Sequence, residues 1–368
     1  MGSPMPKRAR MLLMLGAAIT AALALAPAAG AAEPRMKLDP KLQVATVCLP
    51  VTDPVGLPRQ LYGKRYTPPS ATSSTPAVVL VHGIASSTAN WDFSPTWSTA
   101  RALASAGYVV YSYDRLGYAR SSYFDMPGGG ATLTTREHRR MLHQVVQDVK
   151  TGGYSTTATD NCAAATPGGM RNPTVAILGH SAGGWIVAGY PGTYHDVAAM
   201  IQTSIVGSTA SSSEESEGSE GGGFTPNSEH PDYFDFFHER SECESFNVFA
   251  PGAVPSVVDI ACTPPFIPSP YGEIADLAVK LAENDVAISQ IGPGTPVLLS
   301  SGDHDTTAPP PDARADFEYY KTHCGCDVSQ HFIPDSGHLY QVHASLAQTV
   351  DVFVRWLSSR GLPPTKRG

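Results

Sequence analysis

Short apolar runs alternate with longer stretches of helical periodicity from residue 59 onward. The short runs are continuous rather than alternating, which is typical of parallel strands that are covered on both faces. We predict strands at residues 77–81, 108–113, 174–178, 198–205, 296–300 and 330–333. This order indicates repeated βαβ units and a mostly parallel central sheet with helices on both faces.

Helices are predicted between these strands, at residues 97–106, 134–150, 182–190, 271–284, 313–322 and 339–359. The last has the clearest pattern, because its apolar positions recur at spacings of three and four residues. These positions are Leu346, Val350, Phe353, Val354 and Leu357. One face of this helix is therefore expected to pack on the sheet.

Two consecutive segments interrupt the alternation. Residues 207–223 are mostly Ser, Glu and Gly, with too little apolar surface to offset the entropy of ordering, which predicts a mobile acidic loop. Residues 224–270 are rich in Phe, Tyr and Pro, and we interpret them as a cap over the site. A surface elaboration away from the site is the alternative. The core then consists of residues 32–206 and 271–368.

The first 31 residues have the pattern of a secretory signal peptide. Lys7, Arg8 and Arg10 precede an apolar run at 11–26, and small residues at 29–31 precede Glu33. A membrane anchor is disfavoured because a spanning helix needs roughly 20 apolar residues and this run ends at Pro27. We therefore expect a secreted protein, extracellular or periplasmic, with no stable membrane anchor.

The chain is acidic. Its formal net charge is −8, and the leader carries three positive charges and no negative one, so the charge without it is −11. Nucleic acids and anionic membranes bind clustered Lys and Arg, and both are therefore disfavoured as partners.

Six cysteines follow the leader, and an even number in an exported protein predicts disulfides. Six cysteines allow 15 connectivities, which the sequence does not resolve. Within the cap we predict a bond between Cys243 and Cys262, because this loop has little regular structure to hold it. Zinc is disfavoured because Cys324 and Cys326 are closer together than the usual Cys-x-x-Cys pair. No metal or organic cofactor is expected.

The strongest chemical signal is Gly179-His180-Ser181-Ala182-Gly183, between a predicted strand and a predicted helix. This is the Gly-x-Ser-x-Gly nucleophile elbow in the strand-turn-helix context that it requires. Small residues are needed because the turn leaves no room for side chains beside the serine. Ser181 is therefore the candidate nucleophile.

A second strand ends in His82-Gly83-Ile84, with Trp91 a few residues further on, and a third runs into 113–117, Tyr-Asp-Arg-Leu-Gly. Together with the elbow, these features resemble the α/β-hydrolase superfamily of esterases, lipases and peptidases. The resemblance covers roughly residues 59–206 and 271–359, and it departs at Ala119, where the family often has glycine. It implies an oxyanion hole formed by the N–H groups of Ile84 and Ala182, and substrate contacts from His82, Gly83 and Trp91.

A nucleophilic serine needs a base and an acid that orients the base. One late strand runs into Asp303-His304-Asp305, and the next runs into a loop that ends at His338. The order Ser181, Asp305, His338 is the one that this fold uses. The resemblance favours Asp305 as the acid because it lies three residues after Gly302, and Asp303 is expected to brace the loop through backbone N–H groups.

A serine nucleophile implies acyl transfer through an acyl-enzyme, with water as the final acceptor. We expect a small-molecule ester or lipid substrate with hydrophobic acyl or aryl groups. A serine aminopeptidase is the enzymatic alternative, since ten acidic residues between 214 and 244 could attract an amine. Cofactor-free haloperoxidases share the triad, so a peroxidative side activity stays open. A non-catalytic, ligand-binding relative is the remaining alternative, although such proteins usually lose a triad residue.

Overall fold

The computed structural model describes residues 36–210, 224–275 and 277–365. The predicted signal peptide and residues 211–223 of the predicted mobile loop lie outside the described residues.

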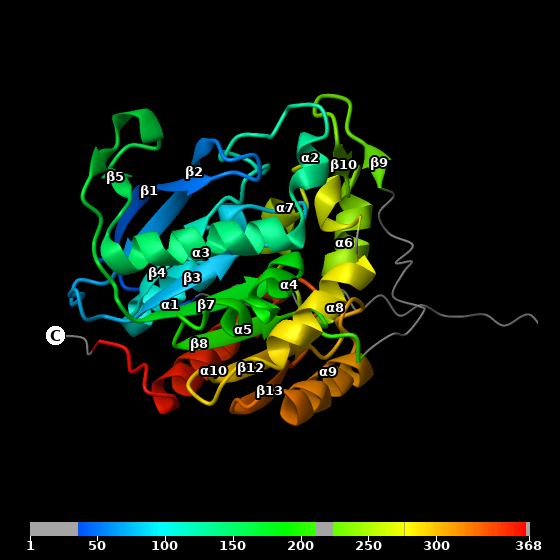
Figure 1. Cartoon of the computed structure of the whole chain (residues 1–368). Coiled ribbons are helices and arrows are strands. Elements are labelled where there is room, and N and C mark those ends of the chain that lie inside the picture. The colour runs from blue at the N-terminus through cyan, green and yellow to red at the C-terminus, as the bar shows by residue number, and fades with distance from the viewer. Residues whose placement is uncertain (1–35, 211–223, 276, 366–368) are drawn as a thin grey trace, which may run out of the picture. The chain divides into compact units, whose positions relative to one another are not determined.

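The described chain is built around a ten-stranded sheet. Its strands are β1 Gln43–Thr52, β2 Pro58–Thr67, β3 Ala77–Val81, β4 Val109–Tyr113, β5 Ser155–Thr157, β6 Thr166–Pro167, β7 Val175–His180, β8 Ala199–Thr203, β12 Val297–Gly302 and β13 Val328–Ile333. Their spatial order is β13-β12-β8-β7-β3-β4-β2-β1-β5-β6 (Figure 1). The six predicted strands form the parallel part of this sheet.

The antiparallel part was not predicted. β1 pairs with β2, and β2 joins the parallel strands by pairing with β4. β2 carries Arg59, Lys64 and Arg65 and has Gly63 in its centre, so it contains no continuous apolar run. These strands extend one side of the sheet, where charged side chains reach water.

Each predicted helical segment contains a helix. The main helices are α1 Thr99–Ala106, α2 Gly129–Thr132, α3 Thr135–Thr151, α4 Ala182–Ala188, α5 Tyr190–Tyr194, α6 Arg240–Asn247, α7 Pro255–Ala261, α8 Leu277–Ile288, α9 Pro310–His323 and α10 Leu346–Ser359. The segment predicted at 182–190 divides into α4 and α5 at Gly189. α3 is capped at its start by Thr134, whose side chain accepts the N–H of Glu137, and at its end by Gly152 in the left-handed conformation. Among the described helices, none is both long and apolar enough to cross a membrane.

Hydrophobic clusters cover both faces of the sheet. Val78 and Leu80 of β3 belong to the cluster that includes α1 and α10. Val79 and Val81, which alternate with them, belong to the cluster that includes α3 and α4. Because successive side chains of a strand point to opposite faces, strands that are covered on both sides are apolar throughout.

The segment interpreted as a cap is more regular than expected. It contains α6, α7 and a small sheet of β9 Thr225–Pro226, β10 Tyr233–Asp235 and β11 Ser269–Pro270. The disulfide between Cys243 and Cys262 is present as predicted, beside those that join Cys48 to Cys162 and Cys324 to Cys326. The aromatic residues Phe234, Phe236 and Phe237 belong to the cluster with α1 and α10, so this segment packs on the core.

The beginning of the predicted mobile loop is held in place. The N–H groups of Gly207 and Ser208 donate to the buried carboxylate of Asp316 on α9, over 3.0 and 3.1 Å. A distant acidic side chain thus supplies hydrogen-bond partners to these two residues that the composition of the segment does not reveal.

Candidate active site

Ser181 lies at the tip of a sharp turn between β7 and α4. Its backbone has a φ of 55° and a ψ of −127°, a strained conformation for a residue other than glycine. Its N–H donates to the carbonyl of Thr203 at the end of β8, over 3.0 Å. The turn thereby holds Ser181 at the carboxyl edge of the parallel strands.

Two glycines allow this turn to lie against the end of β3. A Cβ on Gly179 would lie 2.2 Å from the carbonyl oxygen of Gly183, and a Cβ on Gly183 would lie 2.2 Å from that of Val81. The parallel register pairs Val81 with Gly179, which brings the end of β3 beside Ser181. Any side chain at either glycine would force these segments apart.

His338 connects Ser181 to Asp305. Its Nε2 lies 2.9 Å from the Ser181 Oγ, and its Nδ1 lies 3.1 Å from Oδ1 of Asp305. Because a carboxylate accepts hydrogen bonds, Nδ1 carries the ring proton and Nε2 accepts from the serine hydroxyl. The three side chains are buried, with Ser181 the most exposed at 8%.

The surroundings of Asp305 favour its charged form. Burial raises the pKa of this carboxyl, but the neighbouring His338 and the N–H groups of Thr307 and Ala308 lower it more, so its pKa lies below the usual value. The two N–H groups donate to Oδ1 over 2.9 and 3.1 Å. A charged Asp305 can therefore hold the His338 ring in the required tautomer.

Asp303 occupies a different place, as expected. Its carboxylate accepts the N–H groups of Asp335 and Ser336, both over 3.1 Å. β12 and β13 are parallel neighbours, with Gly302 opposite Ile333, so the loops that follow them lie side by side. Asp303 thus links the loop that carries Asp305 to the loop that carries His338.

The two residues expected to form an oxyanion hole both lie beside Ser181. Ala182 is the first residue of α4, so its N–H has no acceptor within the helix. Gly83 and Ile84 line the pocket with Ser181, and a Cβ on Gly83 would be only 2.9 Å from the Cβ of Ser181.

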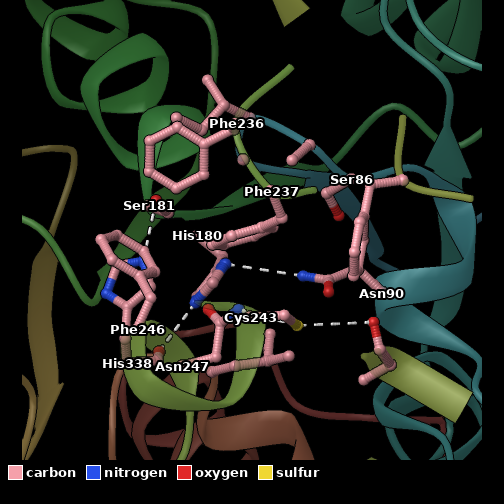
Figure 2. Close-up of a pocket in the computed structure, with 16 residues that line it drawn as sticks. Ser86, Asn90, His180, Ser181, Phe236, Phe237, Cys243, Phe246, Asn247 and His338 are labelled. Carbon is pink, nitrogen blue, oxygen red and sulfur yellow. Dashed lines mark hydrogen bonds between the residues drawn. The ribbon is translucent and has the colours of Figure 1, made fainter. Parts of the chain in front are cut away.

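A small aromatic pocket opens above Ser181. Figure 2 shows Phe236, Phe237 and Phe246 near Ser181 and His338. The ring of Phe246 packs edge-on against that of His338, with centroids 4.9 Å apart. The pocket encloses about 50 Å³. Among the described residues, no three His, Cys, Asp or Glu side chains are grouped to hold a metal ion.

The structure does not bring the side chains of His82 and Trp91 to this pocket. Both are fully buried. Trp91 packs in the core near His180, with ring centroids 6.3 Å apart, and His82 hydrogen-bonds to backbone groups behind the pocket wall. We therefore do not assign substrate contacts to these two side chains, because packing behind the pocket occupies both.

Several pocket residues were missed by the sequence analysis. His180 stands at the variable position of the elbow, and its Nε2 lies 3.0 Å from the carbonyl oxygen of His338. Burial lowers the pKa of His180 to about 3, with a smaller contribution from His338, so the ring is neutral. The Phe residues and Asn247 come from the inserted segment, where composition signals an aromatic cluster but not which rings face the serine.

Comparisons with known proteins agree with this architecture. The family model described as "Alpha/beta hydrolase family" matches residues 78–352. No curated protein is similar enough in sequence to match the chain.

Solved structures share the fold at low sequence identity. The chain is similar to the monoacylglycerol lipase from Paleococcus ferrophilus, with 18% identity, a TM-score of 0.55, and coverage of 82% of this chain and 99% of that one. It is also similar to a thermophilic esterase from Thermogutta terrifontis, with 16% identity, a TM-score of 0.54, and coverage of 86% and 98%. Est1E from Butyrivibrio proteoclasticus is 16% identical, with a TM-score of 0.51 and coverage of 82% of this chain and 96% of that one. At these identities the likeness shows the fold alone.

Proposed function

The chain belongs to the α/β-hydrolase family, and from this premise we propose that it is a secreted serine hydrolase that cleaves carboxylic esters of small hydrophobic acyl or aryl groups. The observation that carries the proposal is the hydrogen-bonded series Ser181, His338 and Asp305 beneath an aromatic pocket. Lipases and esterases are among the proteins that share this fold, which agrees with the proposal.

In the proposed reaction, Ser181 Oγ attacks the ester carbonyl while His338 Nε2 takes the hydroxyl proton. Asp305 stabilises the imidazolium that forms, through its contact with Nδ1. The C–O bond of the tetrahedral intermediate then breaks, and His338 returns the proton to the leaving alkoxide. Water repeats the sequence on the acyl-enzyme and releases the acid.

The negative charge on the tetrahedral oxygen needs donors that are already in place. Gly83 and Ile84 lie beside Ser181, and Ala182 follows it at the start of α4. We assign the N–H groups of Ile84 and Ala182 to this role. Phe rings line the pocket, and hydrogen bonds to this oxygen are stronger in such apolar surroundings than in water.

The pocket favours a neutral substrate over an amine. Among the described residues, none of the side chains that line it is a carboxylate, whereas an aminopeptidase needs an anionic partner for the substrate amine. The pocket is also smaller than the roughly 300–1,000 Å³ typical of sites for drug-sized ligands. A short acyl or small aryl group therefore fits best.

Secretion is part of the proposal because two independent features support it. The first 31 residues have the sequence pattern of a signal peptide. In addition, all six cysteines of the described residues are paired in disulfides, which persist mainly in oxidising compartments.

A panel of substrates tests the reaction class. We expect p-nitrophenyl acetate and butyrate to be hydrolysed with a higher kcat/KM than longer p-nitrophenyl esters or aminoacyl p-nitroanilides. Faster cleavage of the anilides would establish the aminopeptidase alternative. If none of these compounds is turned over and a fluorophosphonate does not label the protein, the non-catalytic alternative is favoured.

Phe266 offers a test of acyl-chain selection. It is half-buried, lines the pocket and packs against Phe237, with centroids 5.5 Å apart. Phe266→Ala should enlarge the pocket. The ratio of kcat/KM for the octanoate ester to kcat/KM for the acetate ester should then rise by about 10-fold, because apolar contact with one or two additional methylene groups is enough for such a change. Phe317→Ala on α9 is the matched control, because Phe317 is also half-buried but lies outside the pocket. An equal change in both variants would show that the inserted segment does not select the acyl group.

A further inference from the structure

A buried ion pair lies behind the pocket wall. Nη1 of Arg115, two residues after β4, is 2.6 Å from Oε1 of Glu273, just beyond the inserted segment. Each side chain is only 1% exposed. Burying two charges is costly even when they are paired, so their place in this structure calls for a role beyond packing.

The second terminal nitrogen of Arg115 points to that role. Nη2 donates to the carbonyl oxygen of Gly83 over 2.9 Å. Glu273 and the ring of Tyr118 fix the guanidinium plane: the tyrosine hydroxyl donates to the same carboxylate oxygen, and the Arg115 Cζ lies 4.4 Å from the ring centroid. The planar fork of arginine can satisfy two such partners at once.

His82 holds the same carbonyl oxygen from a second direction. Its Nε2 is 3.1 Å from the backbone nitrogen of Arg115, which can only donate, so Nε2 is the acceptor. The ring proton of the neutral imidazole is therefore on Nδ1, which lies 2.8 Å from the carbonyl oxygen of Gly83. Burial, reinforced by the charge of Arg115, keeps the pKa of His82 well below its usual value, so the ring stays neutral.

The geometry of the peptide unit links the direction of the Gly83 carbonyl to the direction of the Ile84 N–H. The Gly83–Ile84 bond is trans, so the carbonyl of Gly83 and the N–H of Ile84 point in opposite directions. Holding the carbonyl toward Arg115 and His82 turns the N–H to the other side. The α-carbon of Gly83 itself faces Ser181, since a Cβ there would lie 2.9 Å from that of the serine.

We propose that Arg115, balanced by Glu273 and assisted by His82, is a positioning residue that holds the Gly83–Ile84 peptide with its N–H directed at the tetrahedral oxygen. The inference rests on the proposed function, because it concerns the oxyanion hole of that reaction. It also accounts for the burial of His82 behind the pocket. A purely structural pair would instead fasten residue 273 to the end of β4 and leave the chemistry unchanged.

The test is the double variant Arg115→Met/Glu273→Gln, which removes both charges and leaves neither unpaired. We expect kcat for p-nitrophenyl butyrate to fall by about 10- to 100-fold while KM changes by less than about threefold. This loss is smaller than the roughly 10²- to 10³-fold cost of deleting an oxyanion-hole donor, because His82 still holds the carbonyl. Arg115→Lys provides a second variant: it keeps the charge beside Glu273, but one ammonium cannot match both partners of the arginine fork.

Arg139→Met is the matched control for loss of stability. Arg139 is also buried, and it donates to the carbonyls of Trp185 and Ile186 on α4 over 3.3 and 3.2 Å. Among the described residues, the hydrogen bonds of its side chain do not include one to Gly83. Loss of these bonds should lower Tm, while kcat stays close to that of the wild type.

Crystal structures of the wild type and both Arg115 variants complete the test, because they report the direction of the 83–84 peptide independently of turnover. A turned peptide together with the loss of kcat supports the inference. An unchanged peptide, or folded variants whose kcat stays within about twofold of the wild type, would overturn it. If the wild type hydrolyses no ester, the proposed function fails, and the crystal structures still decide whether Arg115 positions the peptide.

Discussion

Ser181→Ala is expected to abolish labelling by a fluorophosphonate and to lower kcat for p-nitrophenyl butyrate by about 10⁴- to 10⁶-fold. The reason is that His338 Nε2, 2.9 Å from the serine oxygen, loses the hydroxyl that it activates for the first attack. The remaining turnover would come from the pocket and the oxyanion hole acting on water. Labelling is measured by mass spectrometry of the intact protein, and turnover by release of p-nitrophenol.

Ser204→Ala is a closely matched control. Ser204 is buried, has a φ of 56° and follows β8, the neighbour of β7 in the sheet. Within the part of the chain that the structure describes, its hydroxyl has no hydrogen-bond partner, and Ser204 is not among the residues that line the pocket. This variant should keep both labelling and turnover. Labelling that survives in Ser181→Ala, or more than about one part in a thousand of wild-type turnover, would show that another group is the nucleophile.

Asp305→Asn is expected to lower kcat by about four orders of magnitude. Oδ1 of Asp305 accepts all three N–H groups, from Thr307, Ala308 and the His338 ring. An amide that places its NH₂ group there faces His338 with a donor and drives the ring to carry its proton on Nε2, where it can no longer accept from Ser181. An amide that places its oxygen there keeps the three hydrogen bonds, but the charge that stabilises the imidazolium is lost in both orientations. Because the side-chain volume is retained, Tm should change little.

Asp303→Asn gives the opposite pattern. Its two carboxylate oxygens accept separate N–H groups, from Asp335 and Ser336, and an amide has only one acceptor oxygen. We expect a lower Tm, because the brace between the two loops weakens, and a kcat within about 10-fold of the wild type since the His338–Asp305 contact stays intact. The reverse result, with Asp303→Asn inactive and Asp305→Asn merely less stable, would transfer the role of the acid to Asp303.

The parallel part of the fold was predictable because its signals are local. β3 is apolar along its whole length and β7 is apolar from Val175 to Leu178, since helices cover both faces. The hairpin of β1 and β2 was missed because the pairing partner, and not the residue pattern, makes β2 a strand. Its charged residues are equally compatible with a loop, and only the pairing with β4 shows that this segment is a strand.

The place of each candidate catalytic residue was also predictable to a large extent. Ser181, Asp305 and His338 all follow parallel strands, and the carboxyl ends of parallel strands meet at one edge of the sheet. The resemblance to the α/β-hydrolase superfamily favoured Asp305 over Asp303. The structure adds that Asp305 contacts His338, while Asp303 contacts the backbone of the neighbouring loop.

By itself, the sequence determined the α/β architecture, the positions of the parallel strands along the chain and the strand ends that carry the candidate triad, because periodicity and turn chemistry act over a few residues. Tertiary structure alone decided which Phe rings surround Ser181, why His82 lies behind the pocket, and that Arg115 meets Glu273. Arg115 and Glu273 are 158 residues apart in the chain. Contacts over such separations depend on how whole elements pack, and no local pattern records them.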